Sequence, residues 1–519
     1  MRFGNSFGAL LLGLGLVVSG MVASCPAQAA FSMQDVIQQA KKLAAKPYKE
    51  PAKAPQQLLD LGYDKFQQIR FDPDQSLWHE SRSNFQVMLT APGKFFAHPV
   101  KLNLVDASGV HALPFNKQWF SWPDDFAKQV PNKLGYAGFR LTFPLNQPDT
   151  KNQFLAFAGA SYFRGVARDE NFGLSARGIA VNTGLPGGEE FPNFTQFWLV
   201  RPSPSAKVVE FYALLDGPSL TGAYHFVVFP GAVLRIEVRA NLFVRKHTEL
   251  LGLAPLTSMF FYGKNTPRPV NDWRPAVHDS DGLLIHSGTG EWLWRPLLNP
   301  LTLQMDYFTT DSPQGFGLLQ RNRDFTAYED AEARYDNRPS AWVEPHEDWG
   351  AGQVVLTQIP TDSETNDNIV AFWTPKQKPE AGQQYELNYT LSFGAPTIAQ
   401  NPMAQVVATH VGSGADPGTK AATASQLYRF VVDFAGGELD DAKPDSTISA
   451  VVTGLSDTQV RQQSVHFVAP AKVWRLSIQA APAKDKPVAL RAYLKSGDKT
   501  LSETWSYALP ANNRFNHAH

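Results

Sequence analysis

Hydrophobic residues in this chain occur mainly in short runs, often alternating with polar residues, and turn residues separate the runs. Five such runs are Phe85–Leu89, Val100–Leu104, Val208–Tyr212, Leu234–Val238 and Val354–Thr357. They are rich in strand-forming residues, and Pro, Gly, Asn and Asp stand between them. Because the chain also has 38 glycines and 38 prolines, we predict an all-β protein whose main unit is a large β-sandwich.

Helical spacing of apolar residues is convincing only near the start of the chain. The segment Met33–Ala44 places Val36, Ile37, Ala40 and Leu43 on one face. This pattern predicts an amphipathic helix ahead of the first strands.

The composition changes after the run Leu391–Gly394. Residues 395–425 are rich in Ala, Gly, Thr and Pro, which predicts a linker with one strand around Val406. Strand-like runs return at Leu427–Phe434 and Val473–Ile478. We therefore predict a large N-terminal β-sandwich over residues 30–394, the linker, and a small immunoglobulin-like sandwich over residues 426–519.

The first residues resemble an export signal. Arg2 precedes an apolar run from Ala9 to Ala23, and Ala27-Gln28-Ala29 offers small residues for cleavage. This predicts a signal peptide over residues 1–29 and a periplasmic location. A competing interpretation makes Cys25 a lipid-bearing N-terminus, and only in that case would the mature chain contact a membrane.

Charge and composition narrow the class of partner. The 47 basic residues are balanced by 48 acidic ones, so there is no electrostatic basis for binding nucleic acid. Aromatic residues make up 12% of the chain, and exposed rings are common platforms for sugar faces. We therefore expect an uncharged or weakly charged partner.

One segment carries acids and amides directly into an apolar run. It spans Asp362–Pro375, and its polar part contains Glu364, Asp367 and Asn368. A carboxylate held at the end of a rigid strand suits acid–base chemistry on a polar, uncharged substrate. The alternative is a polar turn that merely caps a strand.

Acids, arginines and aromatic residues are interleaved through the region between residues 274 and 343. A polysaccharide groove requires this mixture, because rings stack on sugars while charged groups bind hydroxyls. The alternative is that the tryptophans fill the core and the arginines form surface ion pairs. The predicted substrate-binding residues are Glu291, Trp292, Trp294, Arg321, Arg338 and Trp342.

No metal or cofactor site is expected. His278, Asp279 and His286 lack the spacing of a diagnostic ligand set, and no serine or cysteine nucleophile stands out.

Several long strings resemble a known family, the periplasmic glucans biosynthesis protein G family, whose paralogue is protein D. The resemblance covers essentially the whole mature chain. It is carried by Gly159–Arg164, Phe172–Gly178, Ala254–Met259, Gly290–Trp292, Pro313–Arg321, Glu364–Val370 and Leu501–Tyr507.

This resemblance implies a fold, an activity and a set of site residues. The implied fold is a β-sandwich similar to those of carbohydrate-active enzymes, joined to an immunoglobulin-like domain. The implied activity is that of an inverting endo-β-1,2-glucanase in the synthesis of osmoregulated periplasmic glucans. Carried over by motif, Asp367 is the general acid, Asp279 the general base, and Tyr335 belongs to the path that positions water or relays its proton.

These roles set physical requirements. The two carboxyl groups of an inverting enzyme usually lie roughly 6.5–9.5 Å apart, with water between them. Asp367 needs a setting that raises its pKa, to which Phe372, Trp373 or Glu364 could contribute. Asp279 needs to stay ionised, for which we expect help from Arg274 or His278.

Two other functions remain open from the sequence. One is a non-catalytic protein that binds the β-1,2-linked glucan chain, receives it from a membrane glucan synthase and assists its release or branching. The other is a branching transglycosidase, which would hold an acceptor sugar in place of water.

Overall fold

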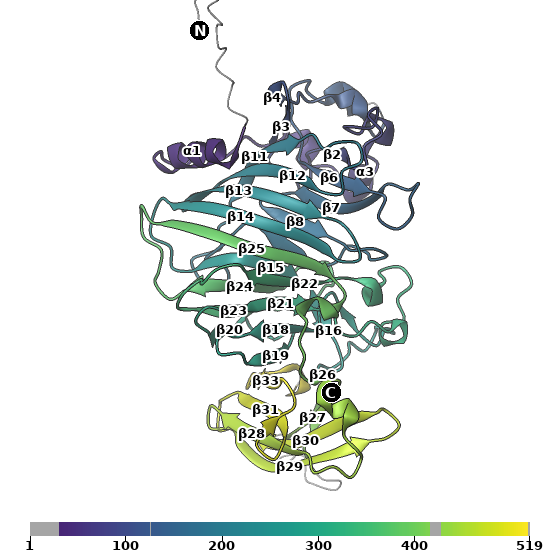
Figure 1. Cartoon of the computed structure of the whole chain (residues 1–519), viewed down its shortest axis with the longest axis vertical. Coiled ribbons are helices and arrows are strands. Elements are labelled where there is room, and N and C mark those ends of the chain that lie inside the picture. The colour runs from purple at the N-terminus through teal and green to yellow at the C-terminus, as the bar shows by residue number, and fades with distance from the viewer. Residues whose placement is uncertain (1–30, 125, 416–426, 517–519) are drawn as a thin grey trace, which may run out of the picture.

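The computed structural model describes residues 31–124, 126–415 and 427–516. The predicted signal peptide and Cys25 therefore lie outside the described residues, as does the end of the predicted linker. The fold is almost entirely β, as predicted, and forms one long body with the C-terminal strands at one end (Figure 1). No helix among the described residues has both the length and the apolar character needed to cross a membrane.

Two large sheets form the main sandwich. One has ten strands, and its path is β2 (Gln86–Thr90), β6 (Gly138–Phe143), β7 (Asn152–Ala158), β8 (Tyr162–Gly165), β9 (Ser175–Arg177), β15 (Leu251–Ser258), β24 (Ile369–Pro375), β23 (Gly352–Gln358) and β20 (Gln304–Thr309). A short strand, β10 (Ala180–Val181), pairs with β15 beside this path.

The other large sheet has fifteen strands and extends into the C-terminal part. Its main-sandwich strands, in order, are β19 (Trp292–Pro296), β18 (Gly282–His286), β21 (Gly315–Leu319), β22 (Ser340–Pro345), β25 (Gln384–Gly394), β14 (Leu234–Val244), β13 (Leu220–Phe229), β12 (Val209–Asp216), β11 (Asn193–Val200), β3 (Lys101–Asp106) and β4 (Gly109–Ala112).

The strands predicted from alternating runs are present. The runs that begin at Phe85, Val100, Val208, Leu234 and Val354 correspond to β2, β3, β12, β14 and β23. The two sheets pack face to face through phenylalanines. The rings of Phe139 and Phe197 lie 5.1 Å apart, and those of Phe157 and Phe211 lie 5.2 Å apart. Each pair joins one strand of each sheet, which confirms the sandwich.

The predicted amphipathic helix is α1 (Met33–Ala44), and it lies outside the sandwich (Figure 1). Its buried residues Val36 and Ala40 belong to a separate cluster with Trp198 and Tyr212 of the fifteen-stranded sheet. Asp35 accepts a hydrogen bond from the backbone N–H of Ser32 and so caps the first turn.

Further short elements join the strands. Two short helices, α2 (Gln56–Leu59) and α3 (Tyr63–Gln67), follow α1 in the chain. There are also two two-stranded sheets among the described residues. One pairs β1 (Arg70–Phe71) with β5 (Phe120–Ser121), and the other pairs β16 (Phe260–Tyr262) with β17 (Val277–His278). Short 3₁₀ helices lie at Pro73–Gln75, Lys117–Trp119, Phe126–Gln129, Phe325–Ala327, Tyr335–Asn337, Pro396–Ala399, Gly437–Asp441 and Arg514–Asn516.

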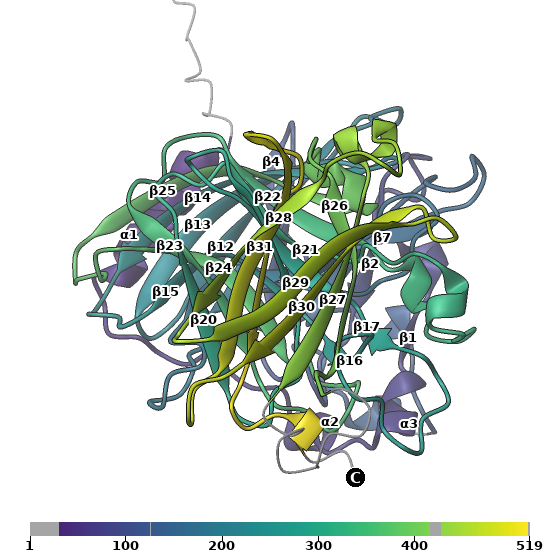
Figure 2. The same cartoon turned by 90° about the horizontal axis from the view of Figure 1, so that it is seen from below.

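The C-terminal part is a second, smaller sandwich. One sheet contains β26 (Gln405–Ser413), β27 (Tyr428–Ala435), β30 (Val473–Ala481) and β29 (Gln459–Val468). The other side is the end of the fifteen-stranded sheet, which contains β28 (Ser449–Leu455), β31 (Val488–Ser496), β32 (Lys499–Thr500) and β33 (Thr504–Leu509). Figure 2 shows these strands crossing the end of the main sandwich.

The strand expected around Val406 is β26. It lies inside the range predicted as a linker, but it pairs with β27 from Gln405↔Ala435 to Ser413↔Tyr428. It is therefore an integral strand of the C-terminal sheet. The two sandwiches are also joined by β19 and β33, which pair in parallel through Leu293↔Thr504 and Trp294↔Trp505.

We expect the aromatic core to dominate the stability of the main sandwich. Phe157 is 1% exposed and contacts phenylalanines of both sheets, so Phe157→Ala should lower the free energy of unfolding by about 3–5 kcal/mol. Denaturant titration measures this loss. Val270→Ala, at a 99% exposed position, is the control and should change stability by less than about 0.5 kcal/mol. Equal effects of the two substitutions would contradict this account of the core.

Candidate functional site

The Asp279 segment is held by backbone pairing. His278 pairs with Phe260 across β16 and β17, and the N–H of Asp279 donates to the carbonyl of Met259 at 2.8 Å. Successive side chains of an extended chain point to opposite sides. Accordingly, His278 stacks on the Phe260 ring, whereas Asp279 forms an ion pair with Arg338.

The Asp367 segment is fixed by its neighbour Asn368. Asn368 is buried, and its side chain accepts from the N–H of Phe260 at 2.8 Å and donates to the carbonyl of Phe260 at 3.0 Å. Asp367 lies just before β24, so this clamp ties its loop to the strand that pairs with His278. The backbone of Phe260 thus links the Asp279 and Asp367 segments.

The two carboxylates have different surroundings. Asp279 is 4% exposed; burial raises its pKa, the positive charge of Arg338 lowers it, and the negative charge of Asp367 raises it. The Asp367 side chain is 30% exposed, and its Oδ2 lies 3.3 Å from Nη2 of Arg164. The structure therefore brings these two acids within electrostatic reach of each other, one buried and one open to solvent.

The prediction that Arg274 or His278 helps to keep Asp279 ionised is wrong. His278 donates from Nδ1 to Oε1 of Gln320 at 2.9 Å, and burial lowers its pKa to about 4, so it carries no charge near neutral pH. Arg274 binds Asp272, Asp330 and Glu364. Arg338, which the sequence suggested for substrate binding, is the cation on Asp279. Sequence order does not show which arginine the fold delivers to a buried acid.

Tyr335 lies beside this pair. Its hydroxyl donates to Oε2 of Glu364 at 2.8 Å, and the guanidinium of Arg338 lies 4.4 Å from its ring centroid. Burial and the negative charge of Glu364 raise the pKa of Tyr335. Glu364 also accepts from Arg274 at 2.7 Å. The expected member of a proton path is therefore near Asp279, with its hydroxyl hydrogen-bonded to a carboxylate.

The other predicted substrate-binding residues lie between the sandwiches or in their core. Arg321 forms a bidentate ion pair with the buried Glu503 at 2.5 and 2.9 Å, and its guanidinium lies 3.6 Å from the Trp294 ring. Glu291 accepts from Thr504 at 2.6 Å and pairs with Arg491.

The remaining tryptophans pack among themselves and their neighbours. The Trp292 ring stacks on His286 at 3.9 Å and lies 5.9 Å from Trp342, which is 2% exposed. Glu291, Trp292, Trp294, Arg321 and Trp342 thus make contacts that join or fill the two sandwiches. The interpretation of these tryptophans as core residues fits their contacts better than a polysaccharide groove does.

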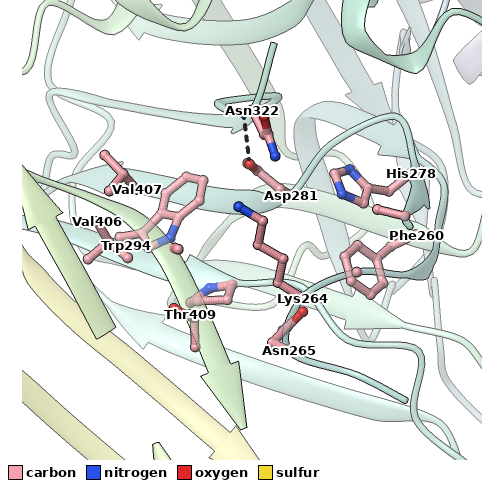
Figure 3. A pocket seen from close by; sticks show the side chains of 14 residues that line it. Phe260, Lys264, Asn265, His278, Asp281, Trp294, Asn322, Val406, Val407 and Thr409 are labelled. Carbon is pink, nitrogen blue, oxygen red and sulfur yellow. Dashed lines mark hydrogen bonds between the residues drawn. The ribbon is translucent and has the colours of Figure 1, made fainter. Parts of the chain in front are cut away.

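A narrow cavity lies on the side of the Asp279 segment that faces the C-terminal sandwich (Figure 3). His278 and Asp281 line it from the main sandwich, and Val406–Thr409 line it from β26. Lys264 also lines it, with its ammonium pointing inward in Figure 3. Burial raises the pKa of Asp281 to about 6, although the charge of Arg321 opposes this. The interface between the two sandwiches therefore adjoins the segment that carries Asp279.

Sequence reasoning missed two residues at the site. Arg164 holds Asp367 and also donates from Nε to Ser175 Oγ at 3.1 Å. Trp273 is 64% exposed and directly precedes Arg274, which binds Glu364. Its position in Asn271-Asp272-Trp273-Arg274-Pro275, outside any alternating run, was a usable signal for an exposed ring.

Comparison with known proteins identifies a family that the chain matches over most of its length. Residues 31–509 match the family described as "Periplasmic glucan biosynthesis protein, MdoG". The chain is also 43% identical over 494 residues to "Glucans biosynthesis protein G" of Dickeya dadantii (strain 3937), covering 93% of this chain and 94% of that protein.

Arg321→Met tests whether this residue joins the sandwiches. It leaves Glu503, which is 1% exposed, without its cation. We expect a loss of about 3–5 kcal/mol in the free energy of unfolding, measured by denaturant titration. The double variant Arg321→Met/Glu503→Leu removes both charges and should recover part of the loss. Unchanged stability together with lost glucan binding would instead place Arg321 in a groove.

Proposed function

This chain belongs to the periplasmic glucan biosynthesis protein family, and we propose that it acts there as an inverting endo-β-1,2-glucanase on the glucan backbone. The observation that carries the proposal is the pair Asp279 and Asp367, which come from distant segments and interact electrostatically. Inverting hydrolysis needs two carboxyl groups with different roles, and these two differ in exposure and in partner. The proposed source of the glucan chain is a membrane glucan synthase.

Asp367 is the proposed general acid. It is the more exposed of the two carboxyl groups, so a glycosidic oxygen can approach it. In the reaction, the bond between the anomeric carbon and the leaving oxygen breaks, and Asp367 gives its proton to that oxygen. This role requires that Asp367 carry a proton when the glucan is bound.

Asp279 is the proposed general base. Arg338 favours its ionised form, while burial and the charge of Asp367 strengthen its affinity for a proton. A carboxylate with a raised pKa is a better base than an ordinary aspartate, provided that it stays ionised at the working pH. The attacking water forms the new bond to the anomeric carbon, and its proton passes to Asp279. Tyr335, whose hydroxyl donates to Glu364, helps to position that water.

The exposed ring of Trp273, next in sequence to Arg274, could serve as a platform for a sugar face. Neutral sugar hydroxyls also suit the polar, hydrogen-bonded surroundings of Arg274, Asp330 and Glu364. These contacts support an uncharged saccharide as substrate. The preference for the β-1,2 linkage comes from the family resemblance.

Asp367→Asn and Asp279→Asn should each slow cleavage of linear β-1,2-glucan by about 10²–10⁴-fold, because each removes a proton-transfer group. Reducing ends and product size measure the loss, and Asp149→Asn, at an exposed position, is the control. NMR of fresh products should show the α-anomer. Products with the β-anomer would favour the branching transglycosidase. Binding without cleavage by the native chain would favour the non-catalytic glucan-binding protein.

The pH profile tests the partner of Asp279. Arg338 lowers the pKa of Asp279, so its removal in Arg338→Met should raise that pKa. The base is then protonated at a higher pH, and the acidic limb of kcat/KM should move to higher pH. Arg338→Lys retains a positive charge and should shift the limb less. An unmoved limb in Arg338→Met would contradict Asp279 as the base.

A further inference from the structure

A second cavity lies far from the Asp279–Asp367 pair, between the edge of the ten-stranded sheet and the segments around α3, β1 and β5. Its volume is about 560 Å³, within the range of small-molecule sites. Strands β2 and β6 contribute Met88–Thr90 and Arg140, and the covering segments contribute aromatic side chains. The aromatic lining residues are Phe66, Phe71, Phe95, Phe96 and Phe120.

Arg140 is the unusual member of this lining. It lies on β6, opposite Met88 of the edge strand β2, and it is half-buried. Among the described residues it has no carboxylate partner, and its one hydrogen bond is a long contact of 3.5 Å to Gln153. Burial lowers its pKa, which reflects the cost of holding a cation there. An anion supplied from outside would offset that cost.

The other residues that line the cavity also favour an anion. Arg70 adds a second guanidinium at an exposed position, and none of the described residues that line the cavity is an aspartate or glutamate. Phe95 is 66% exposed, with the ammonium of Lys94 4.9 Å from its ring centroid. The cavity therefore combines positive charge with rings that can pack on a flat ligand.

We propose that this cavity binds a small organic anion, in which a carboxylate or phosphate group is attached to a ring. The anionic group pairs with Arg140, assisted by Arg70, and the ring packs against the phenylalanines. Both a sugar acid and an aromatic acid have this chemistry. The proposal is independent of the glucanase activity, because the site shares no residue with the Asp279–Asp367 pair.

Calorimetric titration of the full mature chain tests the proposal with matched probes. Glucuronate is compared with glucose, benzoate with benzamide, and inorganic phosphate serves as an anion without a ring. At least one ring-bearing anion should bind about tenfold more tightly than both its neutral counterpart and phosphate. Preference for glucuronate identifies a sugar acid, and preference for benzoate an aromatic acid. The proposal fails if no ring-bearing anion shows this preference.

Two variants separate ligand binding from folding. Arg140→Met retains much of the apolar stem, so its thermal midpoint without ligand should equal or exceed that of the native chain. It should bind the preferred anion at least about tenfold more weakly. Arg239→Met, at an exposed position on β14, is the matched control and should bind normally. Equal binding by the native chain and Arg140→Met would overturn the assignment.

Phe95→Ala tests the ring contact at a position where truncation should leave the fold intact. We expect weaker binding of the ring-bearing anion, with any weak phosphate binding unchanged. Unchanged binding of the ring-bearing anion would overturn the proposed role of the phenylalanines.

Discussion

The face-to-face packing of two large sheets is the constraint on which the other features of this protein depend. Phenylalanines from both sheets pack against one another in the core, for example Phe139 against Phe197 and Phe163 against Phe226. Burial of so much aromatic surface fixes the register of every strand, because a shift by one residue would turn the core face outward. The loops at the strand ends therefore have rigid anchor points.

The candidate site uses this rigidity. Asn368 directly precedes β24, and its side chain forms hydrogen bonds with the backbone of Phe260. Phe260 in turn pairs with His278. Two acids from remote parts of the sequence are thereby linked through the backbone of Phe260. The cost of burying Asp279 is offset by Arg338, which is itself held by the carbonyl of Ala333.

The same segment also faces the second sandwich. His278 and Asp281 line the interdomain cavity on one side, whereas the Asp279 side chain pairs with Arg338. The union of the sandwiches rests on the parallel pairing of β19 with β33 and on the buried pair Arg321–Glu503. Several charged and aromatic residues that the sequence suggested for substrate binding therefore join the two sandwiches instead.

The sequence by itself determined the periodic features. Alternation identified strands such as β2, β12, β14 and β23, and helical spacing identified α1, because each pattern depends only on neighbouring residues. The motif around Asp367 was visible for the same reason. Only the tertiary structure decided that Arg338 pairs with Asp279, that Arg321 and Glu291 join the sandwiches, and that β26 completes the C-terminal sheet. Those outcomes depend on contacts between residues far apart in the chain, which strand pairing and burial select and local pattern does not encode.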